Sequence, residues 1–119
     1  MKDGVIRVFI SQPMNGKTIE EIKKDRERIV KAVLSRFCAE CEVIDNIIHD
    51  DAPEDVNGVW HLGKSIQQMY DADVVIFSRD YPTARGCLIE HDVAMKYNMT
   101  VCYELTDDVY TIGYGYEWS

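Results

Sequence analysis

Segments typical of strands alternate with segments of helical periodicity along almost the whole chain. The strand-like segments are short and rich in β-branched and aromatic residues, and the third of them, residues 72–77 (ADVVIF), ends in four consecutive apolar side chains. Apolar residues on both faces of a strand are typical of a parallel sheet that helices cover on both sides. We expect strands at residues 5–10, 41–45, 72–77, 100–103 and 109–112, and helices at about 18–37, 58–71 and 85–97.

This order of elements restricts the fold class. Only a parallel sheet with right-handed crossover connections accommodates it. We therefore predict a three-layer α/β fold of the Rossmann or flavodoxin type, with four or five mainly parallel strands and helices on both faces. The 119 residues suffice for one core, so a single domain over residues 1–119 is expected. Ligands of such sheets bind beyond the carboxyl ends of the strands, which places the predicted site in the loops at residues 11–17 and 78–86.

The first predicted helix divides its residues between core and solvent. Thr18 and Glu21 form a T-x-x-E capping box, a pattern that starts many helices. The charged stretch at residues 23–28 is expected to be mostly solvated. Apolar side chains recur around it at helical spacing, at Ile22, Ile29, Val30, Val33 and Phe37.

Acidic residues outnumber basic ones, with 21 Asp and Glu against 13 Lys and Arg and a net charge of −8. An acidic surface repels nucleic-acid polymers and anionic lipid, so we expect no polymeric nucleic acid and no membrane among the partners. No apolar run approaches the roughly 20 residues that cross a bilayer, and the N-terminal residues lack the apolar core of a signal peptide. A cytoplasmic location is therefore expected.

The four cysteines are Cys38, Cys41, Cys87 and Cys102. In a reducing cytoplasm they are expected to stay free thiols rather than form disulfides. The pair Cys38-x-x-Cys41 has no second pair and no nearby histidine to complete a tetrahedral zinc site. It also follows a predicted helix, whereas a redox CxxC motif usually opens one. No metal site is therefore expected.

Glu90, in the third predicted helix, is the first candidate for chemistry. Its neighbours at i−3 and i+4 are Cys87 and Ala94, so Glu90 lies on a stripe of small residues that faces inward. A carboxylate on the buried side of a helix is costly unless it is paired or used. Two interpretations follow from the spacing: an ion pair with Arg85 or Arg79, and a catalytic carboxylate.

Two stretches carry a resemblance to a known family. The first is residues 8–16 (VFISQPMNG), and the second runs from the strand at 72–77 through Tyr81, the Ala84-Arg85-Gly86-Cys87 segment and Glu90 to Ala94. Together they resemble the nucleoside 2-deoxyribosyltransferase superfamily, which also contains 2′-deoxynucleoside 5′-monophosphate N-glycosidases and small bacterial and phage proteins. The resemblance spans roughly residues 5–104 and is specific in the first loop and in residues 86–94.

The resemblance implies an activity. In this family a glutamate, here Glu90, attacks C1′ of a deoxynucleoside or its 5′-monophosphate, forms a glycosyl-enzyme ester and expels the base. Water or a second base then releases the sugar. The implied ligand is a small-molecule nucleoside or nucleotide, and neither a metal nor an organic cofactor is implied. The family also completes its pocket with a neighbouring subunit, so a homodimer or a higher homo-oligomer is expected.

Substrate binding is expected in the two loops. Tyr81 is a candidate for stacking on the base, and Arg85 and Gly86 at a helix N-terminus are candidates for holding a 5′-phosphate, with a simple surface charge as the alternative for Arg85. Relatives that hydrolyse monophosphates often carry Ser where this chain has Ala84, so the need for a 5′-phosphate stays open. The first loop offers short side chains and backbone N–H groups that can approach a flat ring, at Ser11, Gln12, Pro13, Met14, Asn15 and Gly16.

The chain departs from the family at the general acid. The family usually places an Asp eight residues before Asp73, where this chain has Ser65, which we keep as a substrate contact. His61 lies one turn earlier on the same helical face, and histidine is a common general acid near neutral pH. Packing beside Trp60 is the structural alternative for His61. Asp45, at the end of the second predicted strand, is another candidate for the acid, with a cap or turn residue as its structural alternative. The departures at Ser65 and Ala84 support a competing hypothesis, a non-catalytic nucleotide-binding sensor of the same fold.

Overall fold

The computed structural model describes residues 4–37, 39–47, 53–55, 57–104 and 110–114, the last range by its backbone only. The strands are β1 (Val5–Ser11), β2 (Glu40–Val43), β3 (Val74–Phe77), β4 (Thr100–Glu104) and β5 (Tyr110–Tyr114). The α-helices are α1 (Ile19–Val33), α2 (Gly58–Met69) and α3 (Arg85–Lys96), and two 3₁₀ turns are η1 (Leu34–Arg36) and η2 (Tyr81–Thr83).

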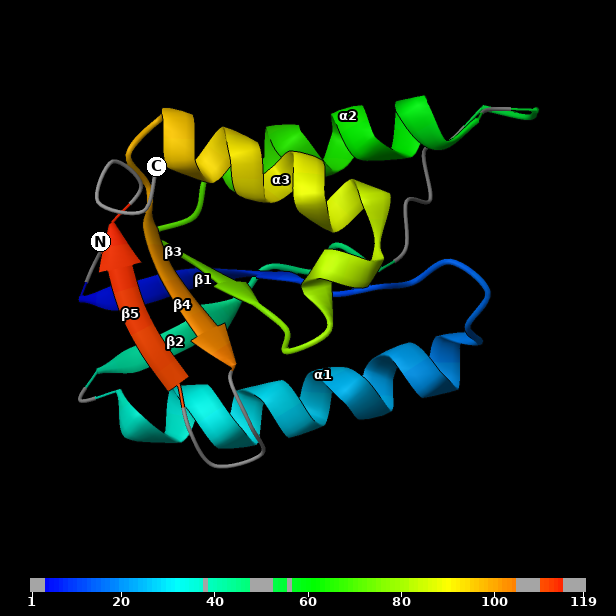
Figure 1. Cartoon of the computed structure of the whole chain (residues 1–119). Coiled ribbons are helices and arrows are strands. Elements are labelled where there is room, and N and C mark those ends of the chain that lie inside the picture. Colours follow the sequence, from blue (N-terminus) through cyan, green and yellow to red (C-terminus); the bar gives the residue numbers. More distant parts are fainter. Residues whose placement is uncertain (1–3, 38, 48–52, 56, 105–109, 115–119) are drawn as a thin grey trace.

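The sheet has the strand order β2-β1-β3-β4-β5. Its first four strands are parallel, and β5 runs antiparallel to β4. Helix α1 covers one face, and α2 and α3 cover the other (Figure 1). This arrangement confirms the predicted α/β fold with a mainly parallel sheet and helices on both faces. Within the described ranges, no helix combines the length and the apolar character that crossing a membrane requires.

Most predicted elements lie within two residues of the observed ones, and the differences have local causes. The first helix ends at Val33, where the chain tightens into η1, rather than continuing to residue 37. The strand expected from residue 72 begins at Val74, because the carboxylate of Asp73 accepts a hydrogen bond from the backbone N–H of Arg7 at 2.8 Å. The capping box is confirmed, since Thr18 and Glu21 exchange side chain-to-backbone hydrogen bonds of 2.9 and 3.1 Å.

The sheet separates two apolar clusters, and β1 contributes to both. Val8 and Ile10 pack toward α1 with Ile29 and Val33, whereas Phe9 packs in the cluster on the α2–α3 side. Successive side chains of a strand point to opposite faces. At the carboxyl end of β1 this alternation places Ser11 on the α3 side of the sheet and the next residue on the α1 side.

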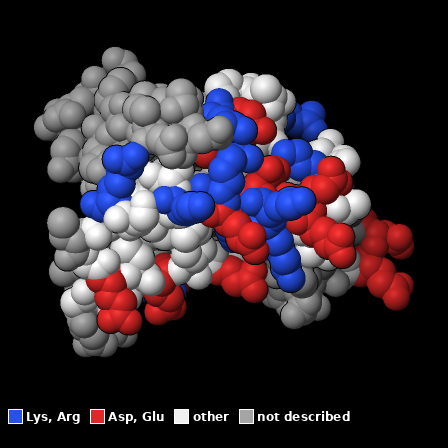
Figure 2. Space-filling model, turned by 90° about the horizontal axis from the view of Figure 1, so that it is seen from below, with Lys and Arg blue, Asp and Glu red and all other residues white. Residues whose placement is uncertain are grey.

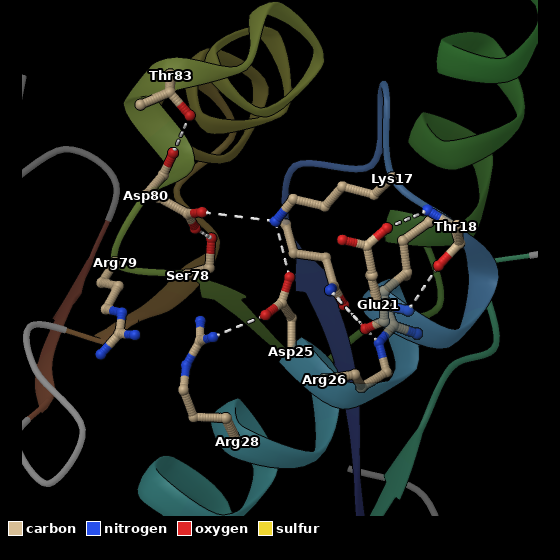
Figure 3. A network of polar contacts seen from close by, with 12 residues as sticks. Lys17, Thr18, Glu21, Asp25, Arg26, Arg28, Ser78, Arg79, Asp80 and Thr83 are labelled. Carbon is tan, nitrogen blue, oxygen red and sulfur yellow. Dashed lines mark hydrogen bonds and ion pairs between the residues drawn. The ribbon is translucent and has the colours of Figure 1, made fainter.

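The carboxyl ends of β1 and β3 form the switch point of the sheet, because the connections from these neighbouring strands lead to opposite sides. Lys17, in the loop after β1, joins the two loops at this point. Its ammonium lies 2.7 Å from a carboxylate oxygen of Asp25 and 3.9 Å from one of Asp80, in the loop after β3 (Figure 3). The two predicted site loops are therefore linked through charged side chains.

Helix α1 corrects the expectation that residues 23–28 are solvated. Arg26 is buried, and Asp25 and Arg28 are half-buried and pair at 2.9 Å. Arg28 also reaches the fully buried carboxylate of Glu104, with hydrogen bonds of 3.0 and 3.1 Å. On the face seen in Figure 2, Lys and Arg are interspersed with Asp and Glu, so the basic side chains there do not form a continuous positively charged surface.

Candidate functional site

Glu90 lies in the first half of α3 with its side chain turned toward the sheet. It is 8% exposed, and the hydroxyl of Ser11 donates a hydrogen bond to its Oε1 at 2.7 Å. Ser11 reaches Glu90 because it ends β1 on the side of the sheet that α3 covers. The stripe of small residues explains the approach of the helix, since Cys87 and Ala94 are both buried. Because Ser11 is the last residue of β1, this contact places Glu90 at the carboxyl edge of the sheet.

No cation of the described residues compensates Glu90. In the part of the chain that the structure describes, its hydrogen-bond partner is Ser11, and it takes part in no ion pair. The structure therefore gives no support to an ion pair with Arg85 or Arg79. Burial raises the pKa of Glu90 to about 7, and the hydrogen bond from Ser11 opposes this effect. A carboxyl group in this state changes its charge near neutral pH.

Cys87 is a second potential nucleophile one turn before Glu90. It is 3% exposed, and burial raises the pKa of its thiol to about 11. Because the thiolate is the reactive form, Cys87 is unsuited to nucleophilic attack near neutral pH. Cys41, Cys87 and Cys102 are free thiols as expected, and Cys38 lies outside the described residues.

The first loop divides its predicted site residues between two sides of the sheet. Ser11 contacts Glu90, but Gln12 is buried on the α1 side, where its Nε2 donates to the carbonyl of Ile22 at 3.0 Å. Gln12 therefore holds the loop onto α1 rather than facing the Glu90 side. Beyond it, Pro13 and Met14 are half-buried, and Asn15 and Gly16 are exposed. The turn at 14–17 needs a positive φ of 79° at Gly16.

Tyr81 is half-buried in an aromatic cluster with Phe77, His91 and Tyr103. Its ring stacks on the imidazole of His91 at a centroid distance of 5.0 Å, and His91 Nε2 lies 2.6 Å from the hydroxyl of Tyr103. Burial lowers the pKa of His91. Sequence reasoning missed the pair of His91 and Tyr103, although His91 stands at i+4 from Cys87 and i−3 from Ala94. The stripe formed by Cys87 and Ala94 therefore has a titratable side chain on each side, Glu90 on one and His91 on the other.

The remaining predicted site residues lie in α2 and at the start of α3. His61 is exposed in the first turn of α2, and its ring meets that of Trp60 edge-on at 5.2 Å, the packing considered as its structural alternative. Ser65 is half-buried one turn further along. Arg85 is exposed and Gly86 half-buried at the start of α3. None of these four predicted site residues is a hydrogen-bonding partner of Glu90.

No family model, curated protein or solved structure matches this chain. The resemblance to the deoxyribosyltransferase superfamily therefore rests on the two sequence stretches that carry it. The geometry of Glu90 is an independent observation, since it depends only on burial and on contacts. Among the residues that the structure describes, no three His, Cys, Asp or Glu side chains gather as a bound metal ion would require.

The raised pKa of Glu90 predicts how stability changes with pH. The unfolded chain releases this proton near the ordinary pKa of 4.5, and the folded protein near 7, so the folded state loses stability as pH rises between these values. Glu90→Gln keeps an acceptor for Ser11 but removes the titration. The free energy of unfolding of Glu90→Gln relative to wild type should rise by about 2 kcal/mol between pH 5 and pH 8.

Urea unfolding at the two pH values measures this difference, and Glu27→Gln is the matched control, since Glu27 is exposed on α1. The control should show the same stability relative to wild type at both pH values. An unchanged difference for Glu90→Gln would mean that Glu90 ionises at its ordinary pKa.

Proposed function

We propose that this chain cleaves or transfers the N-glycosidic bond of a deoxynucleoside or a deoxynucleoside 5′-monophosphate, with Glu90 as the nucleophile. The observation that carries the proposal is a buried carboxyl group whose partner is a hydroxyl rather than a cation. An arginine or lysine partner would hold the carboxylate charge in place and weaken its attack on carbon. A hydroxyl donor at 2.7 Å orients the carboxylate and leaves its second oxygen available.

The proposed reaction proceeds in two steps. The Glu90 carboxylate bonds to C1′ of the sugar, and the electron pair of the C1′–N bond passes to the base, which takes up a proton as it leaves. Water then attacks C1′ of the glycosyl ester, and the bond between C1′ and Glu90 breaks, which regenerates the carboxylate. The hydroxyl of the water stays on the sugar, and its remaining proton passes to the group that protonated the base. A second base in place of water gives transfer. His61 remains the candidate for the proton donor. Because His61 is exposed in α2 and Glu90 is buried in α3, the substrate would have to contact His61 through its base and Glu90 through its sugar.

Base release tests the proposal. Incubation with the four common deoxynucleosides and their 5′-monophosphates, followed by chromatography, should reveal free base from at least one compound. Glu90→Gln should reduce the rate roughly a thousandfold or more, because an amide oxygen is a far poorer nucleophile. Ser11→Ala should retain activity with its pH profile displaced to higher pH, because removing the donor disfavours the charged carboxylate.

Two outcomes would contradict the proposal. Base release by Glu90→Gln at the wild-type rate would remove Glu90 from the chemistry. Saturable binding of a nucleotide with no base released from any of the eight compounds would instead support the nucleotide-binding sensor. Glu27→Gln serves again as the control for loss of an exposed carboxylate.

We also propose that the chain acts as a homodimer or a larger homo-oligomer. The motive is the resemblance, which implies a pocket completed by a neighbouring subunit. Large apolar side chains are also exposed on or beside α2 and α3, a surface of the kind that association covers, at Val59, Tyr70, Leu88, Ile89 and Tyr97. Light scattering at tens of micromolar protein should give at least twice the mass of the chain, and the mass of a monomer would contradict the proposal.

A further inference from the structure

On the opposite side of the sheet from Glu90 lies a second charge that has no counter-ion among the described residues, the guanidinium of Arg26. Arg26 extends from α1 toward the loop after β1 (Figure 3) and is 9% exposed. Its Nε donates to Oε1 of Gln12 at 2.8 Å, and its Nη2 donates to the carbonyl of Ile10 at 3.3 Å. Both acceptors are uncharged. A guanidinium has five N–H donors, so these bonds leave donors unused, including those of Nη1.

Within the described residues, Arg28 is compensated by carboxylates and Arg26 is not. Arg28 pairs with Asp25 and Glu104, whereas Arg26 has no carboxylate within ion-pair distance in the described ranges. Burial lowers the pKa of Arg26 to about 10, and the charge of Asp45 opposes this effect only in part. A buried cation without a counter-ion is costly, and such a cost is usually relieved by pairing or by a bound anion.

Asn46 supplies an independent observation at the same point. It is 3% exposed in the segment after β2, and its Nδ2 donates to the carbonyl of Ile10 at 3.0 Å, the same carbonyl that Arg26 contacts. The Oδ1 of Asn46 is buried, and no donor within the described part of the chain reaches it. Oδ1 of Asn46 needs a hydrogen-bond donor, and the guanidinium of Arg26 needs acceptors. A ligand that carries both acceptors and a donor would satisfy the two side chains together.

We propose that Arg26 and Asn46 form a binding subsite for a phosphate group that keeps one proton. The free guanidinium donors would bind the charged phosphate oxygens, and the remaining P–OH would donate to Oδ1 of Asn46. A carboxylate or a sulfate offers the acceptors but lacks the donor near neutral pH. The proposal is independent of the role of Glu90.

The test uses the side-chain resonances of the two residues. Inorganic phosphate, a deoxynucleoside 5′-monophosphate and sulfate are each titrated into ¹⁵N-labelled protein near neutral pH at constant ionic strength. The guanidinium signals of Arg26 and the side-chain amide signals of Asn46 should shift and saturate with inorganic phosphate, with at least tenfold weaker binding of sulfate. The nucleotide arm shows whether a phosphate ester is accepted as well as the free ion.

Three variants make the test specific. Arg26→Lys keeps the charge but removes the planar set of donors, and should weaken phosphate binding at least tenfold. Asp45→Asn removes a like charge near the bound anion while its amide oxygen can still accept from the N–H of Ile47, and should tighten binding severalfold. Lys23→Gln removes an exposed charge from the same helix and should leave the affinity unchanged.

Several results would overturn the proposal. These are the absence of saturable shifts at Arg26 and Asn46, equal affinity for sulfate and phosphate, or an unchanged affinity in Asp45→Asn. If Arg26→Lys does not fold, Asp45→Asn and the preference for phosphate over sulfate still decide, because Asp45 is exposed and its side-chain hydrogen bond to Ile47 lies at the surface. Failure of this test would leave base release by Glu90 unaffected, so the two proposals are distinguishable.

Discussion

The hydrogen bond from Ser11 to Glu90 connects the end of β1 to helix α3 on one face of the sheet. It satisfies a carboxyl group that is almost fully buried, without supplying a charge of opposite sign. Alternation along β1 makes this contact available, because Ser11 faces α3 while Gln12 faces α1. The switch point between β1 and β3 lies directly beside it, where parallel sheets of this type bind ligands.

Among the described residues, two charged side chains at this edge lack partners of opposite charge, and they do not compensate each other. Glu90 belongs to α3 and Arg26 to α1, so the sheet separates them. Elsewhere in the described structure, buried charge is paired, as in the contact between Arg28 and Glu104. Fold stability alone would favour pairing or replacing both groups. Retaining them unpaired is the pattern expected where a protein accepts a cost in stability for binding or catalysis.

Much of the fold could be predicted, because strand and helix periodicity are local properties of the sequence. The burial of Glu90 followed from Cys87 and Ala94 at i−3 and i+4. The burial of Arg26 did not, although it stands at i+4 from Ile22 and i−3 from Ile29, because a charged residue among charged neighbours is normally solvated. The orientation of Gln12 and the contact of His91 with Tyr103 depend on which faces of separate elements meet, and no local pattern specifies that.

The most direct test of the account is detection of the glycosyl ester on Glu90. Wild-type protein is mixed with a substrate that releases base, quenched in acid within the first turnover, digested and examined by mass spectrometry. We expect the peptide containing Glu90 to gain the mass of the deoxyribosyl group, with fragmentation placing the addition on Glu90. Base release without any adduct, or an adduct on another residue, would contradict Glu90 as the nucleophile.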